Sequence, residues 1–474
     1  MLRDRDPSRS ERIPGSFRDP SGYVFRRDAG IFRAVTPECY NLLRRLADAG
    51  TLTRLVESGG LVATSVVEEP VLLRSLTAEH PDYQHFLAHE PIHPITYPYE
   101  WSASMLADAA ILTLDLQRRL LDIGCSLKDA SAYNVQFVQG RPRFIDVASI
   151  ECPGRVDLWS ALGQFGQMFL FPLLLCRYHG WDLRSYFIAN LNGRTGEQIL
   201  RGLGRLQRWH PRVVLDVTLP ELLRRAAEKR LSKATLRANH ADASAQLVNL
   251  ARLRHKIERL ARGYRPKGVW HDYPSTCTYT SAAEGGKKAF VSSVLRRYKP
   301  ARVLDLGCNT GDYSFLAAAH ASQVVALDGD HDAIEQLYRR LRGHPARITP
   351  MVVDICNPSP AIGYMNTERP SFFERIHGDC VLALALIHHL HVAANLSLSA
   401  IRDLLYRLTT DLVVLEFVPR TDPMFERLGA LRTDGFDEYD LETCKKIFLE
   451  RFALVSEEPV PDSERTLLTL RKQS

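Results

Sequence analysis

The sequence lacks several features that would mark a well-defined class of protein. None of its nine cysteines forms a CxxC pair, and they are scattered and odd in number. Such spacing predicts neither a structural metal site nor a disulfide framework, and it favours a reducing cytoplasm. No apolar run approaches the ~20 residues that cross a bilayer, and residues 1–17 lack the apolar segment of a secretory signal. We therefore expect a cytoplasmic protein with no membrane span.

A strong excess of one charge is also missing. The net charge of +6 comes from 61 basic and 55 acidic residues, a small imbalance in a chain of 474. No RNA-binding module, zinc finger or basic groove is evident, so we do not expect a nucleic-acid partner. One basic amphipathic segment, residues 246–262, is typical of a solvated helix or an inter-domain strut, with RNA or membrane contact as the alternative.

The length predicts two or three domains, at roughly 100–200 residues each. The best boundary is the Gly263–Gly268 segment, which also contains Pro266. We expect a disordered tail at 1–17, a first domain at 18–262 and a second at 263–474. The first begins with a hairpin at 23–35 and contains a helix at 104–122. In the second, strands and helices alternate, which predicts an α/β fold with a mainly parallel sheet.

The most informative segment is VLDLGCNTGDYSFLA, residues 303–317. A short apolar strand leads into a loop framed by Gly307 and Gly311, and a helix begins near Asp312. Glycine suits positions where the backbone turns sharply or where a ligand approaches the main chain. The spacing D-x-G-x-x-x-G is neither the dinucleotide nor the phosphate-loop pattern, and no lysine follows it. The ligand should therefore carry little negative charge here.

Acidic residues and histidines follow the next strands. Asp328 ends the second strand, 21 residues after Gly307, where an acid can accept hydrogen bonds from ribose hydroxyls. Asp354 follows the third strand and can accept from an exocyclic amine. His388 and His389 follow the fourth strand. Parallel strands gather these side chains at one edge of a sheet, which predicts a nucleoside site.

This series, from residue 303 to about 470, resembles the class I S-adenosylmethionine-dependent methyltransferases. The resemblance implies a Rossmann-like C-terminal domain with a mostly parallel seven-stranded sheet, and S-adenosyl-L-methionine as cofactor. It assigns the glycine loop to the methionine part of the cofactor, Asp328 to the ribose and Asp354 to the adenine amine. The cofactor-binding residues that it implies are Asp305, Gly307, Cys308, Asn309, Gly311, Asp328, Gly329, Asp354 and Ile355.

His388 and His389 are the catalytic candidates. A sulfonium methyl group is already electrophilic, so an enzyme must mainly place the acceptor in line with it and sometimes remove a proton. Histidine titrates near neutral pH and suits the second task. Packing beneath the cofactor and a purely structural hydrogen bond are the alternatives. Glu416, on the fifth strand, is a weaker candidate.

Three segments resemble a bacterial group of nodulation-protein-like methyltransferases: Leu382–Leu390, Leu415–Met424 and Ser463–Leu470. This resemblance implies the cofactor but not the acceptor. A small-molecule acceptor is our expectation, and a protein side chain stays open. A bifunctional methyltransferase and phosphotransferase, and a non-catalytic cofactor-binding module, are the alternative functions.

The first domain has a pattern of its own. Asn134 follows Asp129 by five residues, and Asp146 comes 12 residues later. This resembles kinase-type phosphotransferases, especially the small-molecule kinases, in which such residues face the acceptor and the metal. It implies an α+β kinase-like domain with a nucleotide or metal site. However, no glycine-rich loop is present and Arg33 stands where a phosphate-pairing lysine is expected, so we expect a degenerate domain that binds substrate or a partner. Turn chemistry around a hairpin is the alternative.

Two aromatic segments complete the expectations. Residues 93–102, HPITYPYEWS, fall at the hinge of a kinase-like skeleton, where they would line a cleft. Residues 270–279, WHDYPSTCTY, have the density of rings that closes a pocket over a ligand, although core packing explains them equally well.

Overall fold

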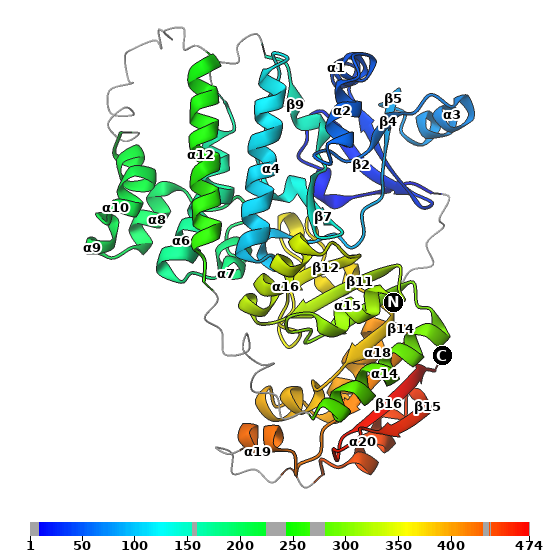
Figure 1. Ribbon diagram of the computed structural model, residues 1–474. Helices are drawn as coiled ribbons and strands as arrows, with labels where there is room; N and C mark the ends of the chain where they lie inside the picture. The colour runs from blue at the N-terminus through cyan, green and yellow to red at the C-terminus, as the bar shows by residue number, and fades with distance from the viewer. Residues whose placement is uncertain are drawn as a thin grey trace.

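The computed structural model describes residues 9–153, 159–223, 243–265, 280–429, 436 and 438–473. Figure 1 shows the strands and helices of the N-terminal domain above a C-terminal domain built on a large sheet. Residues 270–279 lie outside the described residues. Within the described residues, no helix is both long enough and apolar enough to cross a membrane.

A five-stranded antiparallel sheet opens the N-terminal domain, in the order β1-β2-β3-β5-β4. Its strands are β1 (Glu11–Arg12), β2 (Gly22–Arg27), β3 (Gly30–Val35), β4 (Thr64–Val66) and β5 (His85–His89), with helices α1 (Pro37–Asp48), α2 (Thr51–Glu57) and α3 (Pro70–Glu79) beside them. The predicted hairpin is confirmed, because β2 and β3 pair in antiparallel register. Helix α1 follows Thr36, whose side chain accepts from the Cys39 N–H at 3.4 Å. The predicted tail of residues 1–17 is too long, since β1 pairs with β2.

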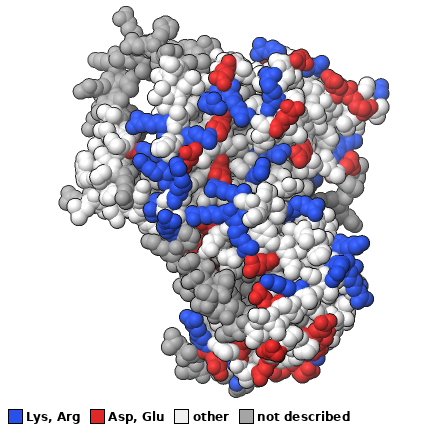
Figure 2. All heavy atoms as spheres, in the orientation of Figure 1, with Lys and Arg blue, Asp and Glu red and all other residues white. Residues whose placement is uncertain are grey.

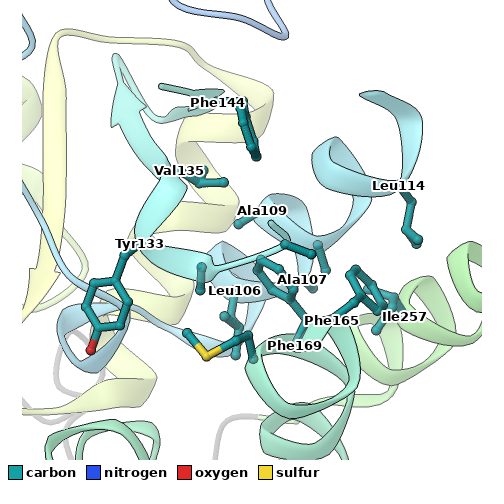
Figure 3. Packing of buried hydrophobic residues seen from close by; sticks show 14 of the residues in the cluster. Leu106, Ala107, Ala109, Leu114, Tyr133, Val135, Phe144, Phe165, Phe169 and Ile257 are labelled. Carbon is teal, nitrogen blue, oxygen red and sulfur yellow. The ribbon is translucent and has the colours of Figure 1, made fainter. Parts of the chain in front are cut away.

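Helix α4 (Ala103–Leu121) is the centre of the rest of this domain. It follows the short helix η2 (Pro98–Glu100), and Figure 3 shows apolar side chains of α4 meeting Phe165, Phe169 and Ile257. Two ribbons follow it, β6 (Ser126–Leu127) with β9 (Ile150–Glu151) and β7 (Val135–Val138) with β8 (Arg141–Phe144). The remaining described α-helices of this domain are α5 (Leu162–Phe165), α6 (Phe171–His179), α7 (Leu183–Ile188), α8 (Gly196–Gly202), α9 (Arg205–Arg208), α10 (Pro211–Val213) and α12 (Ala243–Gly263).

The structure corrects the expectation that the chain contains no disulfide. Cys125 and Cys152 are bonded to each other. Strands β6 and β9 are antiparallel and pair Ser126 with Glu151, so the two cysteines flank a cross-strand pair. The sequence offered no CxxC spacing because this contact is made by strand register between distant segments.

The C-terminal domain contains a seven-stranded sheet in the order β12-β11-β10-β13-β14-β16-β15. The first five strands in this order are parallel and β16 is antiparallel to both of its neighbours, so the prediction of a mostly parallel seven-stranded sheet is confirmed. The strands are β10 (Arg302–Leu306), β11 (Gln323–Asp328), β12 (Ile348–Val352), β13 (Gly378–Ala383), β14 (Thr409–Phe417), β15 (Phe452–Pro459) and β16 (Thr466–Lys472).

Helices cover both faces of this sheet. Successive strand residues point to opposite faces, and each face carries apolar side chains that pack against helices. Val303 belongs to the core under α14, α15 and α16, whereas Leu304 belongs to the core under α17, α18 and α20. The helices are α14 (Ser281–Tyr298), α15 (Asp312–Ala318), α16 (His331–Gly343), α17 (Phe372–Arg375), α18 (Leu398–Leu408), α19 (Pro423–Gly429) and α20 (Leu441–Phe448). The strands are therefore near-continuous apolar runs, as expected for a sheet covered on both sides.

The two domains are joined through the segment 93–102. Glu100 is fully buried and forms an ion pair with Arg375 of α17 at 2.5 Å, and the same guanidinium lies 4.3 Å from the centre of the Tyr97 ring. The expectation that this segment lines an open cleft is therefore wrong. Its prolines and aromatic rings form a buried contact between the domains.

Basic and acidic side chains are interspersed over the face shown in Figure 2. Basic side chains gather around α16, but its arginines have carboxylate partners. Arg339 pairs with Glu335, Arg340 with Asp312 and Arg342 with Asp108. This part of the surface is thus balanced by paired acids.

Candidate functional site

The strand order fixes where a ligand would bind on the C-terminal sheet. From β10 the chain moves outward through β11 to β12, and then returns to β13 on the other side of β10. The strand order reverses between β10 and β13, and ligands of open α/β sheets bind outside the carboxyl ends of the strands at such a point. The glycine loop follows β10, and residues 384–389 follow β13.

The glycine loop has a backbone that requires glycine at both of its ends. Gly307 has φ 67° and Gly311 has φ 89°, both in the left-handed region. A Cβ at Gly311 would collide with Leu337 of α16. The N–H groups of Gly307 and Cys308 donate to the Leu327 carbonyl at 2.8 and 3.0 Å, so the loop is held against the end of β11.

Asp328 is joined to this loop by hydrogen bonds. Its Oδ2 accepts from the Asn309 N–H and its Oδ1 from the Asp330 N–H, both at 2.8 Å. Burial raises the pKa of Asp328 to about 6, although the two N–H donors oppose that change. The carboxylate is thus fixed in orientation, largely ionised at pH 7, and able to accept further hydrogen bonds.

Asp305 and Cys308 lie deeper than the rest of the predicted set. Asp305 is 2% exposed, and its Oδ2 accepts from the Ser314 hydroxyl of α15 at 2.6 Å. Burial raises the pKa of Asp305 to about 6 and raises that of the Cys308 thiol well above its usual range. Asp305 therefore supports the start of α15, and Cys308 is a neutral packing group.

Asp354, Gly329 and Ile355 share the same edge. Asp354 lies two residues beyond β12, and its Oδ1 accepts from the Cys356 N–H at 2.9 Å. A Cβ built on Gly329 would lie 3.6 Å from the Asp354 Cα, so the two loops are in contact. Ile355 packs at the border of the core below α17 and α18. The structure thus brings these residues next to Asp328.

His388 and His389 lie together after β13, with ring centres 4.2 Å apart. His388 is fully buried, and neither of its ring nitrogens has a hydrogen-bond partner among the described residues. Burial lowers the pKa of His388 to about 2 and that of His389 to about 4. Both imidazoles are neutral at pH 7. A buried ring without a partner is unusual, and a ligand or water that pairs with it is a physical reason for its presence.

A cluster of four charged side chains, three of them buried and Asp422 half-buried, lies near the histidines, and we call it the ion cluster. Lys287 Nζ lies 2.6 Å from Glu416 Oε2, Arg465 contacts Glu416 Oε1 at 3.2 Å, and Arg465 Nε contacts Asp422 at 2.7 Å. The positive charge of Arg465 contributes to the lowered pKa of His389. The members of this cluster come from separate segments and share no local pattern, so the sequence alone does not group them with Glu416.

A cavity of about 180 Å³ opens beside the ion cluster. It lies between the start of α14, the loop after β14 and the turn between β15 and β16. Asp422 and Arg465 of the ion cluster line it, together with Thr280, Thr421 and Ser463. Its walls are therefore mainly polar.

The structure also brings Asp129 and Asp146 of the N-terminal domain together. Burial, and next the negative charge of Asp146, raise the pKa of Asp129, while hydrogen bonding from Ser131 and Asn134 opposes that change. However, Arg33 contacts Asp146 at 2.5 Å and is itself 4% exposed. A guanidinium therefore already neutralises the carboxylate that the kinase resemblance assigned to a metal.

No protein-family model matches the sequence. The chain is 33% identical to the nodulation protein NoeA of Rhizobium meliloti (strain 1021) over 471 residues, which are 98% of this chain and 97% of that protein. Among solved structures, it is similar to the N-methyltransferase NodS from Bradyrhizobium japonicum WM9, with 16% identity, 41% of this chain and 98% of that chain covered, and a TM-score of 0.31. It is also similar to magnesium protoporphyrin IX methyltransferase (ChlM) from Synechocystis PCC 6803 with bound SAH. The identity is 16%, the match covers 46% of this chain and 100% of that chain, and the TM-score is 0.32. Both structural likenesses are distant.

Proposed function

The chain belongs to the family of the nodulation protein NoeA, and from this premise we propose that it transfers a methyl group from S-adenosylmethionine to a small-molecule acceptor. We assign residues 263–474 to a Rossmann-like methyltransferase domain and residues 18–262 to a degenerate kinase-like domain. One observation carries the proposal. The glycine loop is bonded both to the end of β11 and to the carboxylate of Asp328, at the point where the strand order reverses.

The residues at this edge fit a nucleoside ligand. The Asp328 carboxylate, held by two backbone N–H groups, would accept from the ribose hydroxyls. Asp354, next to Gly329, would accept from the adenine amine. The absence of a Cβ at Gly307 leaves the backbone open to the methionine part. The buried Asn309 Oδ1 has no hydrogen-bond partner among the described residues, which also fits a ligand with donor groups.

When bound, the cofactor supplies an electrophilic methyl group on a positively charged sulfur. The protein's own part is then to hold the acceptor atom in line and to exclude water. A general base works best when its pKa lies near the working pH, and the pKa of about 4 for His389 lies well below it. We therefore propose that His388 and His389 act as neutral hydrogen-bonding groups that orient the acceptor, rather than as strong bases.

The acceptor group would enter the cavity beside the ion cluster. Its volume of about 180 Å³ lies below the ~300–1,000 Å³ of pockets that enclose a whole drug-sized ligand. It admits the reacting end of a molecule rather than a whole large substrate. Asp422 and Arg465 in its wall are paired and hold each other in place, so they suit the positioning of a small polar group.

The other two functions have less support. Phosphotransfer would need Asp146 to hold a metal ion, and Arg33 already pairs with that carboxylate. A non-catalytic module would not need the buried pair of neutral histidines after β13.

The proposal is tested with methyl-labelled S-adenosylmethionine. Purified protein is incubated with extract of a strain that lacks it, and the labelled products are identified by mass spectrometry. Label in a compound of low molecular mass is the expected result. Binding of S-adenosylhomocysteine without label in any product would leave the cofactor-binding module as the function, and absence of both would overturn the proposal.

Cofactor affinity should depend on pH through Asp328. The ionised carboxylate accepts from both ribose hydroxyls, whereas the protonated form accepts less well. Since the pKa of Asp328 is about 6, the Kd for S-adenosylhomocysteine should be constant above pH 7 and rise as the pH falls through 6, by up to about tenfold per unit. Isothermal titration calorimetry between pH 5 and 8 measures this change.

Asp328→Asn should weaken binding about 10–100-fold at pH 7.5, because hydrogen bonds to a charged group contribute ~1.5–3 kcal/mol. The Kd of this variant should change less with pH than that of the wild type. The change that remains reports the titration of Asp305, whose pKa is also about 6. Asp122→Asn, at an exposed position after α4, is the control. A wild-type Kd that stays constant down to pH 5 would contradict this role of Asp328.

A further inference from the structure

The first turn of α4 lies against the first turn of α16. The Ala103 N–H donates to His331 Nε2 at 3.1 Å. The N–H and the hydroxyl of Ser104 donate to the two carboxylate oxygens of Glu335 at 2.8 and 2.5 Å. Ser104 is 1% exposed and Glu335 is fully buried. The N-terminal domain therefore holds the start of α16, and the two bonds between Ser104 and Glu335 are shielded from water.

Helix α16 begins three residues after Asp328. The side chain of Asp330 caps this helix by accepting from the Asp332 N–H at 2.7 Å, and the Asp330 N–H donates to Asp328 Oδ1. The orientation of the Asp328 carboxylate is thus tied to the position of the first turn of α16. That position is in turn tied to Ser104.

A second contact reaches the same turn from the segment that follows α12. The Tyr264 hydroxyl, just beyond α12, donates to Asp332 Oδ1 at 2.7 Å and lies 3.1 Å from His331 Nδ1. Arg184 of α7 donates to the carbonyl of Asn357, in the loop that follows Asp354. Both loops expected to hold the nucleoside are therefore contacted from the N-terminal domain.

We propose that Ser104 is a positioning residue for the nucleoside site, acting through Glu335 and the first turn of α16. This inference rests on the proposed function, since it concerns the same cofactor. A binding group must be held within about 0.5 Å of its productive place, and the surrounding hydrogen bonds usually do this. Here those bonds come from the other domain, so the N-terminal domain sets the affinity for the nucleoside half of the cofactor.

The same pair of helices offers a matched control. One turn further along, the Tyr338 hydroxyl of α16 donates to Asp108 of α4 at 2.7 Å, and Arg342 Nε donates to Asp108 at 2.8 Å. This contact also joins the domains and Tyr338 is also fully buried. It lies farther from Asp328, so its loss should lower stability without moving the carboxylate.

The test compares Ser104→Ala with Tyr338→Phe by isothermal titration calorimetry. The probes are S-adenosylhomocysteine and 5′-methylthioadenosine, which keeps the nucleoside but lacks the amino-acid part. Ser104→Ala should raise the Kd of both probes by the same factor, about tenfold. Tyr338→Phe should lower Tm to a similar extent and leave both Kd values unchanged. Ser104→Thr, which keeps the hydroxyl, should restore binding.

Three outcomes would overturn the inference. These are wild-type affinity in Ser104→Ala, an equal loss of affinity in both variants, or a loss for S-adenosylhomocysteine alone. If the wild-type protein binds neither probe, the proposed function itself fails, and that result is distinct from a change seen only in the variants.

Discussion

Replacing Gly307 with arginine is expected to abolish binding of S-adenosylhomocysteine. Gly307 has φ 67°, and a Cβ there would already lie 3.2 Å from Leu386 Cδ1 of the segment after β13. An arginine side chain must therefore leave the loop through the space where the ligand approaches the backbone. We expect the Kd to rise at least about 100-fold, which corresponds to ~2.7 kcal/mol. Isothermal titration calorimetry measures it.

Gly180→Arg is the matched control for this variant. Gly180 follows α6 with the same φ of 67°, and nothing lies within 4 Å of its added Cβ. The control carries the same backbone strain and the same new side chain, but at an exposed position in the N-terminal domain, outside the glycine loop. If both variants bind S-adenosylhomocysteine like the wild type, the glycine loop is not the cofactor site.

The second large effect is expected at the contact between the domains. Arg375→Met leaves the fully buried carboxylate of Glu100 without its cation. Removing one partner of a buried ion pair typically costs about 3–5 kcal/mol, because the other charge remains away from water. We expect a loss of this size in the free energy of unfolding, measured by urea denaturation with tryptophan fluorescence as the signal.

Two further variants separate the charge effect from packing. Glu100→Gln combined with Arg375→Met should recover part of the loss, because no charge remains buried. Arg44→Met breaks a pair with Glu68 in which both side chains are substantially exposed, and it should cost at most about 1 kcal/mol. A loss in Arg375→Met no larger than in Arg44→Met would show that the buried pair does not stabilise the junction.

The alternating strands and helices of the C-terminal half could be predicted because their signals are local. The apolar run before Gly307, the acid 21 residues later and the histidines after a fourth strand are patterns within one element or at its end. The structure places them on one edge because parallel strands end there. Asp354 follows the third strand as expected, two residues beyond the end of β12 at Val352.

The features that could not be predicted depend on contacts between distant segments. Arg465 reaches Glu416 only because β16 pairs with β14, and no spacing in the sequence indicates that pairing. The burial of His388 and the bond between Cys125 and Cys152 have the same origin. Segment 93–102 was misread because prolines and aromatic rings suit a binding cleft and a domain contact equally well. The kinase-like resemblance stays a prediction.

Helix α4 connects more than the two domains. Its 19 residues extend over about 28 Å, with Ser104 at one end and Gln117 near the other. The Gln117 side chain accepts from the Leu127 N–H at 2.8 Å and donates to the Ser126 hydroxyl at 3.0 Å, two to three residues before Asp129. One helix therefore contacts α16, which begins three residues after Asp328, and also the segment that leads to the two N-terminal carboxylates. If a ligand bound near one end of α4 changes the affinity at the other end, thermodynamic reciprocity requires an equal change in the reverse direction.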